Sequence, residues 1–162
     1  MTVVILAKWK RNVNVREGMT MYIREAKITD SVAICRISSK DLGYDCEEVF
    51  VKERLENLDE TREVVFVAEV DSKVAGYVHA EIYNLLYWEP MVNILGLAVS
   101  SDCRRKGAGK ALMKQVEEWA KERGIREIRL NSGGTRKEAH EFYRAIGFDD
   151  EKVQIRFLKT VY

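Results

Sequence analysis

Apolar residues recur along this chain at two spacings, and each spacing predicts one type of secondary structure. Alternating or β-branched runs predict strands over 21–26, 62–70, 74–83, 91–100, 126–132 and 152–162. Apolar residues three and four positions apart predict helices over 30–40, 47–58, 108–123 and 136–146. The order β-α-α-β-β-β-α-β-α-β is typical of an α/β (α+β) domain, with a single mixed, mostly antiparallel central sheet and helices on both faces.

Three local signals refine this prediction. Asp30 precedes an apolar helical pattern and is suited to cap the helix that begins there. The turn over 71–73 joins two β-branched runs and predicts a hairpin. The strand over 91–100 is apolar enough to be buried on both of its faces.

The composition narrows the partners and the compartment. The chain has 162 residues, enough for one domain with a hydrophobic core, and its net charge of +1 argues against a nucleic-acid-binding surface. Three cysteines without a C-x-x-C spacing favour neither a disulfide framework nor a metal site, and they fit a reducing cytoplasm. No apolar run is long enough to cross a membrane, and the short run over 3–7 does not read as a signal peptide.

One short stretch concentrates charge in this nearly neutral chain. The sequence CRRKGAGKAL, residues 103–112, joins two arginines and a lysine to two glycines at the expected start of a helix. The N–H groups and the dipole of a helix start favour an anion, and glycine lets a ligand approach the backbone closely. The stretch predicts a site for a pyrophosphate, although a solvated loop around a tight turn would carry the same residues.

Two common phosphate motifs do not fit this stretch. A P-loop needs G-x-x-x-x-G-K-[ST], but Lys110 is followed by Ala111. A Rossmann fingerprint needs a third glycine after Gly107 and Gly109, and its strand would lie earlier in the chain. A general nucleotide-phosphate binder is therefore disfavoured.

The stretch does resemble the acyl-CoA-binding motif Q/R-x-x-G-x-G/A of the GCN5-related N-acetyltransferase (GNAT) superfamily. Here that motif reads RRKGAG over 104–109, and the preceding ILGLAVSSDCR is similar to the family's strand and lead-in. Downstream, SGGTRKEAHEFYRAIGF over 132–148 resembles the second motif, which ends in a tyrosine followed by Gly-Phe. The resemblance implies the GNAT-like acyl-CoA N-acyltransferase fold, with a GNAT domain over 20–162 and an N-terminal extension over 1–19.

The resemblance implies acetyl-CoA (coenzyme A) as the cofactor. The end of the ILGLAV strand should splay from its neighbour, which frees backbone groups of Leu97 and Val99 for the pantetheine. A backbone N–H near Leu97 or Ala98 should face the thioester carbonyl. Many family members carry asparagine where this chain has Arg136, and arginine could reach a phosphate instead. The expected cofactor-binding residues are Leu97, Ala98, Val99, Arg104, Arg105, Lys106, Gly107, Ala108, Gly109, Lys110, Asn131, Arg136 and His140.

The resemblance also implies acetyl transfer to an amine by direct attack, with Tyr143 as the general acid that protonates the departing thiolate. A phenol pKa of about 10 and a thiol pKa of about 8.5 make this proton transfer only mildly uphill. The spacing alone would instead place Tyr143 in the core, on the apolar stripe of its helix. Glu81 is the expected base, with His79 on the same face of the strand and Glu89 as a further candidate.

The acceptor is expected to be a primary amine of a small molecule or a peptide. The link KDLGYDCEE, residues 40–48, offers Asp41, Tyr44 and Asp45, and acids beside an aromatic ring suit a cationic amine. The same acids would also favour the start of a helix without any ligand. The residues leave polyamine, aminoglycoside, amino acid and peptide N-terminus open.

Two classes of function remain at this point. An acetyl-CoA-dependent N-acetyltransferase is favoured by Tyr143, and the alternative is a non-catalytic acyl-CoA-binding module that senses the cofactor or supports a partner protein. The segment TVVILAKW, residues 2–9, is expected to add a strand to a sheet edge or to lie across a dimer contact, which would allow a homodimer.

Overall fold

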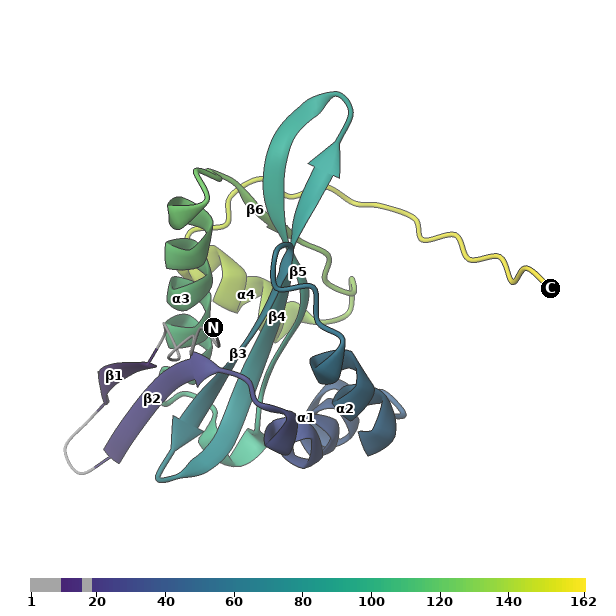
Figure 1. Ribbon diagram of the computed structural model, residues 1–162. Helices are drawn as coiled ribbons and strands as arrows, with labels where there is room; N and C mark the ends of the chain where they lie inside the picture. The colour runs from purple at the N-terminus through teal and green to yellow at the C-terminus, as the bar shows by residue number, and fades with distance from the viewer. Residues whose placement is uncertain (1–9, 16–18) are drawn as a thin grey trace, which may run out of the picture. The chain divides into compact units, whose positions relative to one another are not determined.

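The computed structural model describes residues 10–15 and 19–162 and divides the chain into two compact units (Figure 1). The first unit ends at Leu130, and the second spans Asn131–Tyr162. In chain order, the first unit contains β1 (Lys10–Val15), β2 (Met19–Glu25), α1 (Ser31–Ile37), α2 (Glu48–Glu56), β3 (Glu63–Val70), β4 (Lys73–Leu85), β5 (Trp88–Val99), α3 (Ala108–Glu122) and β6 (Ile128–Leu130). The second unit contains α4 (Lys137–Ala145).

The described strands form one sheet in the order β1-β2-β3-β4-β5-β6. Every neighbouring pair is antiparallel except β5 and β6, which run parallel because α3 crosses over between them. The hairpin of β3 and β4 has the turn expected at 71–73. The predicted single mixed, mostly antiparallel sheet is therefore confirmed.

Helices cover both faces of the sheet in the first unit (Figure 1). Successive residues of a strand point to opposite faces, so β3 buries two different sets of side chains. On one face, Val65 and Val67 pack with Ile37 of α1. The other face of β3 carries Phe66, which is fully buried, and α3, which contacts β3, contributes Trp119, one of the largest buried side chains. The hydrophobic core thus lies in two layers, one on each side of the sheet.

The helix limits differ in detail from those expected. The first helix becomes a π-helical turn, Ser38–Leu42, and ends at Gly43, whose φ of 76° is in the left-handed region. The second helix ends at Glu56, so Leu58 lies beyond it and packs against the core from a turn. These changes place a non-helical link between α1 and α2.

The expected C-terminal strand over 152–162 is wrong for this structure. Residues 148–162 contain no helix or strand, and Val153 and Phe157 are 98% and 89% exposed. An alternating pattern gives a strand only where a neighbouring strand accepts and donates its backbone hydrogen bonds. None of the described strands pairs with this segment.

The N-terminal prediction cannot be compared with the structure at its own residues. The segment TVVILAKW, residues 2–9, lies outside the described residues, so the added strand proposed there stays a prediction. Directly after it, β1 pairs with β2 at the edge of the sheet, and Arg11 forms an ion pair with Glu118 of α3. Among the described residues, no helix could span a membrane, and no group of three His, Cys, Asp or Glu side chains could hold a metal.

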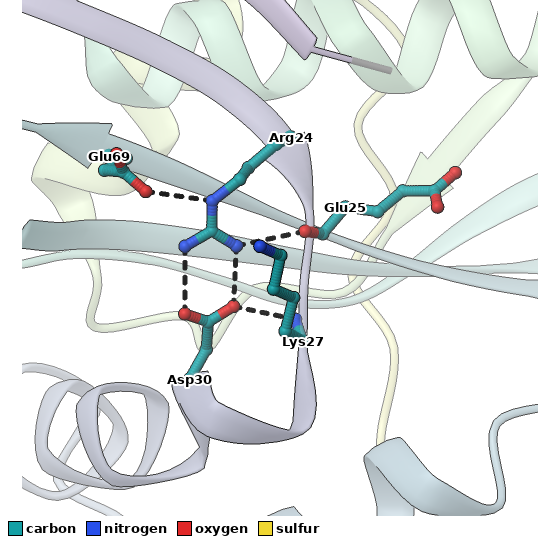
Figure 2. Close-up of polar contacts among 5 residues, drawn as sticks. All are labelled: Arg24, Glu25, Lys27, Asp30 and Glu69. Carbon is teal, nitrogen blue, oxygen red and sulfur yellow. Dashed lines mark hydrogen bonds and ion pairs between the residues drawn. The ribbon is translucent and has the colours of Figure 1, made fainter. Parts of the chain in front are cut away.

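Arg24 of β2 ties the start of α1 to the sheet (Figure 2). Its guanidinium forms two hydrogen bonds with the Asp30 carboxylate, at 2.7 and 3.0 Å, and a third with Glu69 of β3 at 2.9 Å. The backbone N–H of Lys27 also donates to Asp30, at 2.7 Å. Asp30 stands at the start of α1 as expected, but it makes no side-chain cap bond because its oxygens are used by Arg24 and Lys27.

These contacts change the pKa of the Asp30 carboxyl. Burial alone would raise this pKa, but the hydrogen bonds from Arg24 and from the Lys27 N–H together lower it below its ordinary value. The Asp30 side chain is only 8% exposed. The ionised carboxylate is therefore a buried partner on which the fold depends.

We expect Asp30→Asn to lower the free energy of unfolding at neutral pH by about 2–3 kcal/mol, since it leaves a largely buried guanidinium without its main counter-charge. Because the folded-state pKa is lowered, this stabilisation is present above the unfolded pKa of about 3.9 and is lost as pH falls through the folded value. Urea unfolding at several pH values should therefore show the gap between wild type and variant closing below about pH 4.

Glu69→Gln is the matched control, because it removes the charge of a carboxylate that accepts a single hydrogen bond from Arg24 and is 23% exposed. It should cost less than Asp30→Asn at neutral pH. A gap for Asp30→Asn that stays constant from neutral to acid pH would contradict the assigned role of the carboxylate.

Candidate active site

The cationic stretch found in the sequence forms the loop between β5 and α3. A 3₁₀ turn at Ser101–Cys103 leads into it, and α3 begins at Ala108. Two residues have left-handed backbone: Arg105 with φ of 61° and Gly107 with φ of 87°. Such positive φ values turn the chain sharply, so that the first N–H groups of α3 face out of the helix end without helical partners.

The loop is open at Gly107, and its cationic side chains are mostly exposed. A Cβ atom at Gly107 would meet no atom within 4 Å, so only its backbone conformation requires glycine. Arg104, Arg105 and Lys110 are exposed, Lys106 is half-buried, and Ala108 anchors the helix start in the core. Full positive charges therefore surround a helix N-terminus, as the pyrophosphate prediction requires.

Asp41 holds this loop in place from the π-helical turn after α1. Its Oδ1 accepts a hydrogen bond from the Ser101 N–H at 2.9 Å and lies 3.7 Å from Arg104 Nη2. The Asp41 side chain is only 4% exposed. The sequence suggested Asp41 for contact with a cationic acceptor, but the carboxylate instead fixes the loop.

β5 and β6 part after a short paired region. Pairing runs from Val92 to Ile94 of β5, against Ile128–Leu130, whereas β5 continues to Val99. The Ser100 N–H donates to the Ala75 carbonyl at 2.8 Å, on the β4 side. Backbone groups alternate in direction along an antiparallel pair, so Leu97 and Val99 direct theirs away from β4, and Ala98 directs its own toward β4.

A β-bulge marks the point of parting. Ile94 pairs with Ala80 and Gly96 pairs with His79, which leaves Leu95 as an extra residue on β5. Leu95 is 49% exposed, so the expectation that this strand is buried on both faces is wrong there. The bulge changes the strand direction next to the open end, where the resemblance implied a splayed strand. Contact of Leu97, Ala98 and Val99 with a cofactor stays a prediction.

The expected base, Glu81, lies in a row of polar side chains on one face of the sheet. Glu63, Glu81 and Asn93 are directly opposite one another on β3, β4 and β5. Asn93 Nδ2 donates to Glu81 Oε1 at 3.0 Å, and His79 Nε2 lies 3.1 Å from Glu63 Oε2. The row ends at the parting of β5 and β6, which keeps Glu81 as the best placed of the candidate bases.

The structure places the candidate Glu89 away from Glu81 and brings two other residues beside it. Glu89, expected in a loop, lies within β5 and is exposed, four residues before Asn93 and so about 13 Å from the row. Asn93 and Arg129 were not singled out from the sequence, although Arg129 Nη1 donates to Asn93 Oδ1 at 2.8 Å. Only the strand register places them beside Glu81, and a single sequence does not reveal that register.

The second unit contains the remaining expected site residues. Asn131 opens this unit directly after β6, Arg136 precedes α4, and His140 donates from Nε2 to the Gly133 carbonyl at 3.1 Å. Tyr143 is half-buried and makes edge contacts with the rings of Phe142 and Phe148, at centroid distances of 5.4 and 5.6 Å.

The pKa of the Tyr143 phenol is raised above its usual value. Burial is the main cause, and it outweighs the charge of Arg136, which lowers the pKa. The phenol is therefore protonated at neutral pH, as a general acid must be. Tyr143 thus lies on the apolar stripe of α4 and also keeps the proton that a general acid needs; its role as the acid stays a prediction.

The link between α1 and α2 is exposed. Tyr44 and Phe50 are 62% and 61% exposed, and Asp45 and Glu47 are also exposed. Glu48, in the first turn of α2, accepts a hydrogen bond from the Ser31 hydroxyl at 3.4 Å. This region therefore presents exposed aromatic rings beside the exposed carboxylates of Asp45 and Glu47. The carboxylates of Glu48 and Asp41 instead accept hydrogen bonds within the fold.

Comparisons with known proteins identify the family. The model of the acetyltransferase (GNAT) family matches residues 31–148. The chain belongs to the GNAT family of acetyltransferases. It is therefore an acetyltransferase enzyme with acetyl-CoA as cofactor, as the sequence motifs implied, and the exposed cations and open backbone at Arg104–Gly109 fit a phosphate-bearing cofactor.

Individual relatives agree with this assignment. An uncharacterised N-acetyltransferase of Chlorobaculum tepidum is 30% identical over 79% of this chain and 75% of its own length. An N-alpha-acetyltransferase of Sulfurisphaera tokodaii is 30% identical over 85% of this chain and 86% of its own. Some relatives are longer: the chain covers 43% of an uncharacterised N-acetyltransferase of Methanocaldococcus jannaschii, at 36% identity.

A solved structure shows the same fold. An aminoglycoside acetyltransferase from an uncultured soil metagenomic sample superimposes with a TM-score of 0.74 at 21% identity. The match covers 88% of this chain and 97% of that one. At this identity the comparison supports the fold alone.

We expect Gly107→Ala to weaken binding of coenzyme A and to lower stability by about 1–2 kcal/mol, because a side chain in left-handed backbone is strained. Gly124→Ala is the matched control: its φ is 70°, it stands just after the other end of α3, and a Cβ there also meets no atom within 4 Å. Thermal unfolding should show similar losses for both, whereas titration calorimetry with coenzyme A should show a loss only for Gly107→Ala. Equal affinities of the two variants for coenzyme A would mean that the loop at Gly107 is a turn without a role in cofactor binding.

Proposed function

We propose that this enzyme transfers the acetyl group of acetyl-CoA to a primary amine of a small molecule or a peptide, by direct attack. The observation that carries this proposal is the open end of β5, which leads directly into the cationic loop at the N-terminus of α3. The open end of β5 can donate backbone hydrogen bonds, and only a short turn separates it from the cationic loop that we propose as the phosphate site. Bound acetyl-CoA supplies the activated acetyl group.

The side chains and backbone of this protein bind the cofactor and orient its thioester. Arg104, Arg105 and Lys106, with the first N–H groups of α3, bind the phosphates. The outward backbone groups of Leu97 and Val99 bind the pantetheine, and the Leu97 N–H stabilises negative charge on the carbonyl oxygen. Ala98 is less suited to that role, because its backbone faces β4.

Two side chains move protons in this proposal. Glu81 accepts the proton of the amine, directly or through water, so that a neutral nitrogen attacks the carbonyl carbon. Tyr143 donates its phenolic proton to the sulfur as the carbon–sulfur bond breaks, and its raised pKa keeps that proton available at neutral pH. The attacking nitrogen then loses its second proton to the resulting phenolate, which restores Tyr143 and leaves the amide and the free thiol. The exposed link with Tyr44, Asp45 and Glu47 suits an amine that carries positive charge.

An amine panel with acetyl-CoA, followed by the release of free thiol, tests the activity. A peptide with a free N-terminus and an aminoglycoside belong in the panel, because relatives are named as an N-alpha-acetyltransferase and as aminoglycoside acetyltransferases. A polyamine and single amino acids complete it. We expect thiol release that depends on the amine. Binding of acetyl-CoA without release by any amine would favour the non-catalytic acyl-CoA-binding module.

Tyr143→Phe tests the acid. The variant keeps the ring and its edge contacts with Phe142 and Phe148, so stability should change by well under 2 kcal/mol. Turnover should fall by roughly 10²–10⁴-fold, while the affinity for acetyl-CoA should hold. Tyr87→Phe, at a side chain that is 81% exposed, is the control and should leave turnover unchanged. Full activity of Tyr143→Phe would leave the thiolate to take its proton from water.

A further inference from the structure

The row of polar side chains that contains Glu81 and Asn93 continues to Arg129 of β6, and in this subsection the row means Glu81, Asn93 and Arg129 on β4, β5 and β6. Glu81 is directly opposite Asn93, and Asn93 is directly opposite Arg129. Residues in register on neighbouring strands point to the same face of a sheet, so the three side chains meet. The hydrogen bonds run in one direction: Arg129 Nη1 to Asn93 Oδ1 at 2.8 Å, and Asn93 Nδ2 to Glu81 Oε1 at 3.0 Å.

The charges at the two ends of the row fix the orientation of the Asn93 amide. Its oxygen faces a cation that has no acceptor, and its nitrogen faces a carboxylate that has no proton to donate when ionised. A flipped amide would lose both hydrogen bonds. Arg129 is itself held, because its guanidinium carbon lies 4.9 Å from the centroid of the Tyr83 ring.

The row stands where the sheet opens. Asn93 is the residue before Ile94, at which the pairing of β5 with β6 ends. Leu95, the bulge residue, follows, and Leu97 is the first residue beyond it with an outward backbone. All three members of the row are half-buried, so water competes only in part for their hydrogen bonds.

We propose that Asn93 and Arg129 are positioning residues for Glu81. Arg129 polarises the Asn93 amide, and the amide holds Oε1 of the carboxylate, so that Oε2 is directed toward the incoming amine. Without this bond the carboxylate rotates among several orientations, and fewer encounters place it within reach of the proton. The inference rests on the proposed role of Glu81 as the base.

A double-mutant cycle on turnover tests the proposal, with acetyl-CoA and the most active amine of the panel. We expect Glu81→Gln to lower kcat, and Asn93→Leu to lower kcat by about 10-fold with an unchanged KM for acetyl-CoA. In the Glu81→Gln background, Asn93→Leu should cause no further loss, because Asn93 acts only through the carboxylate. Arg129→Met should resemble Asn93→Leu, and Arg129→Lys should restore most of the rate.

The outcomes separate the two proposals. Full turnover of Glu81→Gln, or no turnover of wild type with any amine, would overturn the base assignment and this inference with it. A loss in Glu81→Gln without a loss in Asn93→Leu would overturn the inference alone. The inference would also be overturned if Asn93→Leu lowered kcat by the same factor in the Glu81→Gln background as in wild type.

Glu127→Ala is the structural control. It removes the hydrogen bond from Trp88 Nε1 to Glu127 Oε2, at 3.1 Å, which also links β5 to the segment entering β6. We expect it to lower the melting temperature without changing kcat. If Asn93→Leu and the milder Asn93→Ser also lower the melting temperature without changing kcat, the row only stabilises the pairing of the strands, and the inference is wrong. A rise in melting temperature on addition of coenzyme A would show that each variant is folded.

Discussion

The pairing of β5 on both of its sides constrains the rest of this structure. A central strand normally satisfies its N–H and C=O groups with a neighbour on each side. Here β5 has β4 along most of its length, but β6 only from Val92 to Ile94. The outward groups beyond the bulge at Leu95 are left for another partner. The acetyl-CoA-binding role proposed for Leu97 and Val99 depends on this early end of the pairing between β5 and β6.

The loop that follows β5 depends on a second, weaker constraint. A turn containing left-handed Arg105 and Gly107 needs an external support, because such backbone is strained for arginine. Asp41 provides it by accepting the Ser101 N–H and facing Arg104. Since Asp41 lies in the turn that opens the α1–α2 link, the cationic loop and that exposed link are joined by one buried carboxylate.

Much of the fold followed from periodicity. The helix over 108–123 and the β-branched runs of β3 and β4 were placed nearly to the residue, since their spacing reflects burial directly. The C-terminal segment was misjudged because its alternation is a property of the chain, whereas a strand needs a partner. Asp30 was misjudged for a similar reason. Its position is that of a cap, but Arg24 of β2 binds the carboxylate.

The site divides in the same way. The cationic loop is continuous in sequence, so its charges and glycines are visible in the sequence alone, and the family motifs add Tyr143. The surroundings of Glu81 are assembled from β3, β4, β5 and β6, and they depend on a register that includes the bulge at Leu95. A shift of one residue would turn Asn93 to the other face and remove it from Glu81. Residues whose role follows from register, such as Asn93 and Arg129, therefore become recognisable only in the folded chain.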